Sequence, residues 1–132
     1  MRTMETKLVW VDLSQAKRKL RFPLPVATIG TITTADNHYC GTHDGDLEFC
    51  IRLSSDDEVA VDTVDGVVYR NHYPHVIIKK AGVQHEYSYQ AKRSAFFLIY
   101  PAQLKTRFEE FGVDFHDVAW EIEMTPEMAS VI

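Results

Sequence analysis

The residues best suited to chemistry lie in the stretch KKAGVQHEYSY, which begins as a turn and ends as a strand. Successive side chains of a strand point to opposite faces, so His85, Tyr87 and Tyr89 should share one face. Three polar rings on one face can line a pocket for a small molecule, hold a metal ion, or fill a core with their polar atoms hydrogen-bonded. The alternation by itself leaves these three roles open.

A second stretch, THDGDLEFC, adds His43 in a loop and Glu48 in the strand that follows. If a metal is bound, these two residues and His85 are its candidate ligands, because a metal site needs three or more converging ligands. His38 or His75 could supply another ligand in space, although nothing in the sequence requires it.

Most of the chain alternates at period two, which predicts the short strands that must position these side chains. The run SAFFLIY is apolar on both faces, which predicts a central strand. Asp65-Gly66 lies between two alternating runs and is a two-residue hairpin signal. Strands are predicted at residues 7–12, 26–33, 47–53, 58–64, 67–70, 74–80, 85–90, 94–100 and 117–124. About eight or nine short strands with frequent turns predict a mainly β sandwich or barrel.

One segment near the C-terminus has helical periodicity instead. PAQLKTRFEEFG begins with Pro101, ends with Gly112, and places Leu104, Phe108 and Phe111 on one stripe. Pro at the start and Gly at the end are the expected boundaries of a helix, and the apolar stripe should pack against the rest of the domain.

The last segment, TPEMASVI, has the start signals of a second helix. Thr125 can cap it, Pro126 suits its first position, and Glu127 suits its first turn. No stop signal follows before Ile132. We therefore expect residues 125–132 to be the start of a truncated helix, and the single domain 1–132 to be the N-terminal part of a longer protein.

Composition narrows the classes of partner. The 132 residues suit one domain, and 45% hydrophobic residues can form a core. A net charge of −5 argues against duplex DNA binding by this chain, since DNA requires clustered Lys and Arg. Two cysteines form no CxxC pair or disulfide framework, no apolar run is long enough for a bilayer, and the N-terminus lacks a signal peptide's apolar stretch. A cytoplasmic protein without membrane contact is expected.

The stretches THDGDLEFCIRL and KKAGVQHEY resemble the two sequence motifs of the cupin barrels. In metal-binding cupins the first motif is HxH followed by Glu after three or four residues, and the second is PxGxxH. His43, Glu48 and His85 match these motifs, but Gly41 stands in place of the first histidine and Lys80 in place of the proline. The resemblance implies a double-stranded β-helix, or jelly-roll barrel, with one or two short C-terminal helices. Because one ligand is missing, we expect no metal and no other cofactor.

A closer resemblance is to the N-terminal sensing domain of AraC-type transcription regulators. The stretch VDGVVYRNHYPHVIIKKAGVQHEYSYQAKRSAFFLIYPAQL resembles the core of that domain, and IEMTPEM resembles the entry to its following helices. The resemblance covers roughly residues 40–130. In that family the helices commonly dimerise and a helix-turn-helix DNA-binding domain follows them. A homodimer is therefore possible, and DNA would be bound only through a domain absent from this chain.

The resemblance implies a small-molecule effector, such as a carbohydrate, inside the barrel, with no catalysis. Its pocket wall would include Tyr87 and Phe96, with Ser94 at the start of the strand that carries Phe96. The candidate ligand-binding residues are His43, Glu48, His85, Tyr87, Tyr89, Ser94 and Phe96. The alternative is a small metal-dependent cupin enzyme, an isomerase or a dioxygenase.

Overall fold

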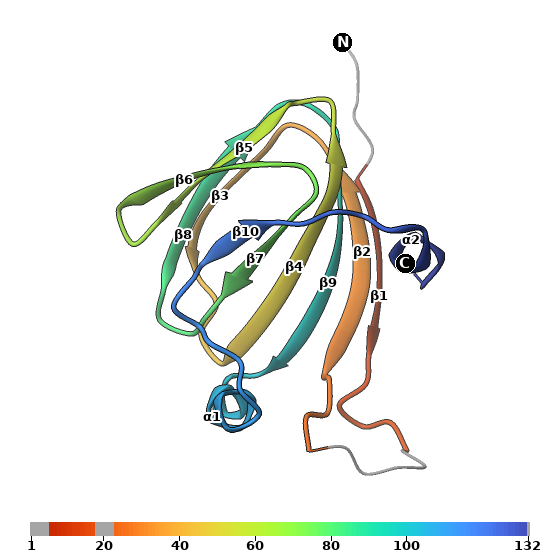
Figure 1. The fold of residues 1–132 in the computed structure, drawn as a ribbon, viewed down its shortest axis with the longest axis vertical. Coiled ribbons are helices and arrows are strands. Elements are labelled where there is room, and N and C mark those ends of the chain that lie inside the picture. The colour runs from red at the N-terminus through yellow and green to blue at the C-terminus, as the bar shows by residue number, and fades with distance from the viewer. Residues whose placement is uncertain (1–5, 18–22, 132) are drawn as a thin grey trace.

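The computed structural model describes residues 6–17 and 23–131, which form two antiparallel sheets and short helices (Figure 1). The six-stranded sheet has the order β1-β2-β9-β4-β7-β10, and the four-stranded sheet has the order β3-β8-β5-β6. The elements are β1 (Lys7–Asp12), β2 (Thr28–Thr34), β3 (Asn37–Thr42), β4 (Asp46–Ser55), β5 (Val59–Val64), β6 (Val67–His72), β7 (His75–Lys79), β8 (Gln84–Tyr89), β9 (Arg93–Pro101), the 3-10 helix η1 (Ala102–Leu104), α1 (Lys105–Glu110), β10 (Ala119–Glu121) and α2 (Pro126–Val131). The prediction of a mainly β, jelly-roll domain with short C-terminal helices is confirmed.

Local sequence signals account for several of these elements. Strand β9 lies between β2 and β4, as its two apolar faces predict. Asp65 and Gly66 have φ angles of 46° and 81° and join β5 to β6, as expected for a two-residue hairpin of type I′. The hydroxyl of Thr125 accepts a hydrogen bond from the N–H of Met128 at 3.2 Å, which confirms the predicted cap of α2.

Two strands differ from the prediction. Strand β3 was not predicted, because its inward positions are Asn37, Tyr39 and Gly41, which give no apolar alternation. Strand β10 is shorter than the predicted strand at residues 117–124, since only Ala119–Glu121 pair with β7. Both strands lie at edges of their sheets, where less of the pattern is set by burial.

The main apolar cluster lies on the outer face of the six-stranded sheet, opposite the space between the sheets. It contains Leu47, Ile78, Phe108 and Phe115, all of which are buried. Leu47 of β4 and Phe108 of α1 belong to this cluster, so the helix packs against the end of the sheet at which β4 begins (Figure 1). The predicted helical stripe is wrong at Phe111, which is 62% exposed, because α1 ends at Glu110.

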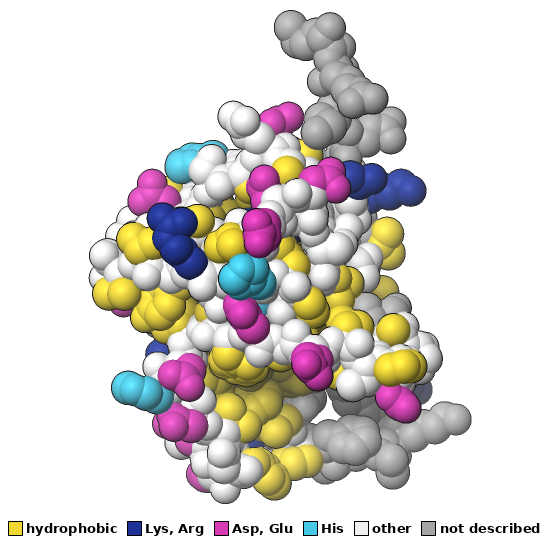
Figure 2. Space-filling model, turned by 45° about the horizontal axis from the view of Figure 1, so that its top comes forward, with side chains coloured by type: hydrophobic (Ala, Val, Ile, Leu, Met, Phe, Trp, Pro, Cys, Tyr) yellow, Lys and Arg dark blue, Asp and Glu magenta, His cyan; other side chains and the backbone are white. Residues whose placement is uncertain are grey.

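Helix length and the distribution of surface charge bear on contact with membranes and nucleic acids. No helix in residues 6–17 and 23–131 has both the length and the apolar character needed to cross a bilayer. On the face shown in Figure 2, acidic and basic side chains are scattered and form no continuous basic surface.

Candidate ligand-binding site

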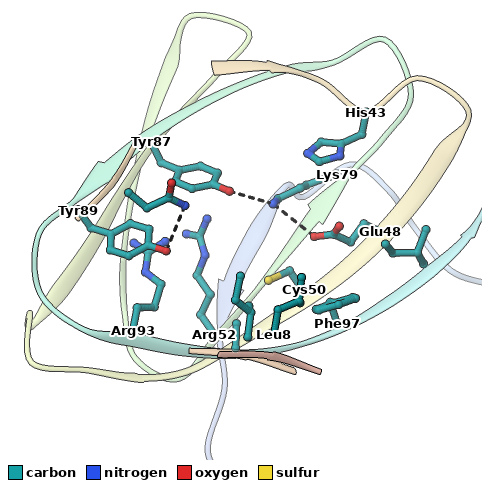
Figure 3. Close-up of a pocket in the computed structure, with 14 residues that line it drawn as sticks. Leu8, His43, Glu48, Cys50, Arg52, Lys79, Tyr87, Tyr89, Arg93 and Phe97 are labelled. Atoms are coloured by element: carbon teal, nitrogen blue, oxygen red, sulfur yellow. Dashed lines mark hydrogen bonds and ion pairs between the residues drawn. The ribbon is translucent and has the colours of Figure 1, made fainter. Parts of the chain in front are cut away.

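A cavity of about 260 Å³ lies between the two sheets (Figure 3). On the side of β3 and β8 its wall is aromatic and polar, with Tyr87 and Tyr89, whereas on the side of β2 and β9 it is apolar, with Ile32 and Phe97. The residues that line it are Leu8, Ile32, Asn37, His43, Glu48, Cys50, Arg52, Lys79, Tyr87, Tyr89, Arg93, Ala95, Phe97 and Ile99. A concave site with a few polar groups and an apolar floor is suited to a small molecule.

Some of the predicted site residues line the cavity, and others do not. His85, Tyr87 and Tyr89 share the inner face of β8, opposite Gly41, Tyr39 and Asn37 of β3. The cavity is lined by Tyr87, Tyr89, His43 and Glu48, and His85 is fully buried with its ring 6.4 Å from that of His43.

The structure corrects the prediction for Phe96 and Ser94. Strand β9 turns Ala95 and Phe97 toward the cavity, so the alternate positions face away from it. Phe96 pairs with Thr31 and Ile51 on the outer face of the sheet, and Ser94 shares a 3.1 Å hydrogen bond with Thr33. Because both faces of β9 are apolar, the alternation could not show which face was inward.

A buried ion pair joins the two sheets across the interior. Arg52 of β4 donates two hydrogen bonds to Asp62 of β5, at 2.6 and 2.8 Å, and both side chains are at most 2% exposed. Burial by itself would raise the pKa of Asp62, but hydrogen bonding and the charge of Arg52 outweigh it, so this pKa lies below its ordinary value of 3.8. Asp62 therefore stays ionised, and the pair is neutral as a unit.

A second ion pair lies at the other end of the cavity. The Nζ atom of Lys79 is 3.3 Å from Oε2 of Glu48 and 3.5 Å from the hydroxyl of Tyr87 (Figure 3). The same ammonium lies 5.8 Å from the ring centre of Tyr39 and 5.1 Å from that of Tyr87. Burial alone would lower the pKa of Lys79, but the charge of Glu48 raises it above its ordinary 10.5. Lys79 is therefore a fixed cation.

This lysine conflicts with the candidate metal site. A divalent ion held by Glu48, His43 and His85 would lie next to the ammonium of Lys79, which already forms an ion pair with the Glu48 carboxylate. The two positive charges would repel each other. The described part of the chain contains no group of three His, Cys, Asp or Glu side chains placed to hold a metal ion. The residues present do not fit a metal centre, and the cation beside Glu48 is supplied by the protein.

Comparisons with other proteins identify the architecture. No protein-family model and no curated protein matches the sequence. The cupin domain of Cnp3 from Schizosaccharomyces pombe superposes with a TM-score of 0.52 over 88% of this chain and 80% of that chain, at 13% identity. This chain has a cupin fold.

Two further structures are similar to this chain. The EutQ protein of Clostridium difficile has a TM-score of 0.51 over 75% of this chain and 68% of that chain, at 17% identity. A predicted oxalate decarboxylase from Thermotoga maritima has a TM-score of 0.48 over 58% of this chain and 67% of that chain, at 12% identity. The likeness is one of fold.

Two histidines of the interior have polar atoms without a partner among the described residues. Both ring nitrogens of His85 and Nε2 of His43 are buried and make no hydrogen bond. Burial, reinforced by the charge of Lys79, lowers the pKa of His85 to about 4, and the same causes lower the pKa of His43. Both rings are therefore neutral at pH 7, and each can donate one hydrogen bond and accept another.

Three cations of the cavity wall were not predicted as site residues: Arg52, Lys79 and Arg93. A partial signal existed in LEFCIRL, where the polar side of the strand carries Glu48 and Arg52. Polar residues on an alternating strand ordinarily indicate a solvent-exposed face, so sequence reasoning could not place them inside the barrel.

Proposed function

We propose that this chain is a small-molecule-sensing domain of an AraC-type transcription regulator, which binds its effector between the two sheets and catalyses no reaction. The observation that carries the proposal is the open cavity walled by Tyr87 and Tyr89 and floored by Ala95 and Phe97. Rigid aromatic faces beside hydrogen-bonding groups suit a compact polar ligand, including a carbohydrate.

The ion pair of Lys79 with Glu48 supports a role without catalysis. Glu48 is the carboxylate that matches the metal-binding cupin motif, and here an ammonium neutralises it. The raised pKa of Lys79 keeps that nitrogen protonated, so its lone pair is not free to attack a substrate at pH 7. The cavity is therefore better suited to recognition than to either metal chemistry or covalent catalysis.

Dimerisation is the second part of the proposal, with a second copy of this chain as the partner. Strand β1 is an edge strand, and its side chains Leu8, Val9, Trp10 and Val11 are each at least half exposed. An exposed apolar edge strand can pair with the same strand of another copy around a two-fold axis. DNA contact would require a domain outside residues 1–132.

A ligand screen tests the binding role. Thermal shift and calorimetry with pentoses, hexoses, amino acids and aromatic amides should find at least one compound that raises the melting temperature. Ala95→Phe, which fills the cavity, should abolish that shift, whereas Phe96→Leu on the opposite face of β9 should retain it. Binding that survives Ala95→Phe would place the ligand elsewhere and contradict the proposal.

Metal analysis tests the alternative of a metal-dependent cupin enzyme. Protein purified without added metal should contain far less than one iron, manganese or zinc per chain, and His43→Ala and His85→Ala should not change that content. A near-stoichiometric metal that both substitutions remove would favour the enzyme.

The association role has its own test. Sedimentation velocity should show a dimer that Val9→Lys dissociates, because the substitution places a charge on the exposed edge strand. Val68→Lys, at an exposed valine on β6, is the control and should leave the dimer intact. A monomer in the unsubstituted protein at high micromolar concentration would rule out self-association through β1.

A further inference from the structure

The cavity carries one positive charge that forms no ion pair with a carboxylate of the described residues. Arg52 is paired with Asp62, and Lys79 is paired with Glu48. Arg93, the third cation of the cavity wall, has no carboxylate within ion-pair distance among the described residues. Because its side chain is only 5% exposed, this charge is largely removed from water.

The surroundings of Arg93 hold its guanidinium in a fixed orientation. Its Nε donates a 2.9 Å hydrogen bond to the hydroxyl of Tyr73, and its Cζ lies 3.8 Å from the ring centre of Tyr89. Among the described residues, the bond from Nε is the one side-chain hydrogen bond that this guanidinium makes, so Nη1 and Nη2 have no partner there. Stacking and the Nε bond thus leave the two-pronged end of the guanidinium free.

The free end of Arg93 belongs to a cavity with a polar and an apolar side. Asn37 donates a 3.3 Å hydrogen bond to the hydroxyl of Tyr89, and both residues line the same cavity as Arg93. The next inward positions of β9, Ala95 and Phe97, are apolar. A molecule with an anionic head and an apolar or ring-shaped body would satisfy both sides.

We propose that the effector is an organic monocarboxylate whose two carboxylate oxygens accept hydrogen bonds from Nη1 and Nη2 of Arg93. The inference rests on the proposed function, since it assumes that the cavity binds a small molecule. A planar guanidinium matches a carboxylate with two parallel hydrogen bonds. One unpaired positive charge is balanced by one carboxylate, whereas a phosphate dianion would leave an excess negative charge in a buried site.

Matched pairs of acid and neutral compound test this assignment, in two arms that distinguish an aromatic acid from a sugar acid. The probes are benzoate against benzamide and glucuronate against glucose, each at millimolar concentration, measured by calorimetry and thermal shift. At least one acid should bind, and its neutral counterpart should bind much more weakly or not at all. The arm that responds identifies the body of the effector.

Substitutions of Arg93 locate the binding group. Arg93→Gln should weaken binding of the acid about tenfold or more, because a hydrogen bond to a charged group is lost. Arg93→Lys keeps the positive charge but lacks the two parallel N–H donors of the guanidinium, so it should retain only part of the affinity. Arg70→Gln, the same change at an exposed position of β6, should leave binding unchanged. Circular dichroism of each variant checks that it is folded.

Several outcomes would overturn the assignment. The first is that an acid and its neutral partner bind equally well. The second is that the acid binds a folded Arg93→Gln variant as tightly as the unsubstituted protein. The third is that neither acid binds. If benzamide or glucose binds while the acids do not, the carboxylate assignment fails and the small-molecule role stands. If no compound of this set or of the wider screen binds, both the carboxylate assignment and the small-molecule role fail.

Discussion

Arg52 on β4 and Asp62 on β5 connect the two sheets through two hydrogen bonds in an interior where both side chains are at most 2% exposed. The nearest ring nitrogen of His75 lies 3.4 Å from Nη1 of Arg52. An ion pair of this kind is costly to bury but more costly to break, because removing one partner leaves the other charge alone in a medium of low polarity.

Breaking this pair should therefore destabilise the fold strongly. We expect Arg52→Met to lower the free energy of unfolding by about 3–5 kcal/mol, and Arg52→Met with Asp62→Leu to regain most of that loss. Urea denaturation measures both. Glu121→Gln is the control, since Glu121 bonds His72 across the same two sheets at an exposed position and should cost about 1 kcal/mol or less. A loss below 1 kcal/mol for Arg52→Met would mean that the pair is hydrated.

Two buried histidines should make stability depend on pH. Burial, with a contribution from Arg52, lowers the pKa of His75 from 6.5 to about 4, and burial with Lys79 does the same for His85. Between pH 6.5 and 4 the unfolded chain binds more protons than the folded one, so stability falls as the pH is lowered through this range. Each histidine contributes a loss of up to about 3 kcal/mol.

Chemical denaturation from pH 7.5 down to pH 4.5 measures this dependence. His85→Leu keeps a similar volume without a titratable ring. It should reduce the slope of the free energy of unfolding against pH between pH 6.5 and 4.5. His38→Gln, at an exposed position of β3, should not. An unchanged slope in His85→Leu would show that His85 does not control the acid sensitivity.

Gly30 should be required for the attachment of β1 to β2. A Cβ atom at this position would lie 2.5 Å from the carbonyl oxygen of Val9, 2.6 Å from Cζ of Phe97 and 2.8 Å from Cβ of Trp10. Because one of these atoms belongs to the backbone, Gly30→Ala should force the strands apart and cost about 1–3 kcal/mol. Urea denaturation followed by tryptophan fluorescence measures the effect. Thr31→Ala, the exposed neighbouring position, is the control, and an equal cost for both would exclude the steric explanation.

The two phenylalanines of the helical segment should differ in their contribution to stability. Phe108 is 8% exposed and contacts Phe49, Tyr100 and Phe115, so Phe108→Ala should cost about 3–5 kcal/mol. Phe111 is 62% exposed, and Phe111→Ala should change the free energy of unfolding by about 0.5 kcal/mol or less. Thermal or urea unfolding of both variants provides the comparison. Similar losses would mean that Phe111 is covered in solution.

Local signals determined much of the secondary structure. The hairpin at Asp65-Gly66 depends on two positive φ angles that Asp and Gly tolerate, and the cap at Thr125 depends on a hydroxyl within reach of Met128 N–H. The common face of His85, Tyr87 and Tyr89 follows from the pleat of a single strand. Each of these features is decided by neighbours in sequence, so each could be predicted.

The tertiary structure alone decided which face of each strand is inward. The polar side of β4, with Glu48 and Arg52, faces the opposing sheet and is buried, whereas the apolar side is fully buried only at Leu47, which clusters with Phe108 of α1. The partners of these charges, Lys79 on β7 and Asp62 on β5, come from separate strands that only the closed barrel brings into contact. Periodicity records how a strand's side chains alternate, but whether a polar side meets water or another charge depends on the distant segment packed against it.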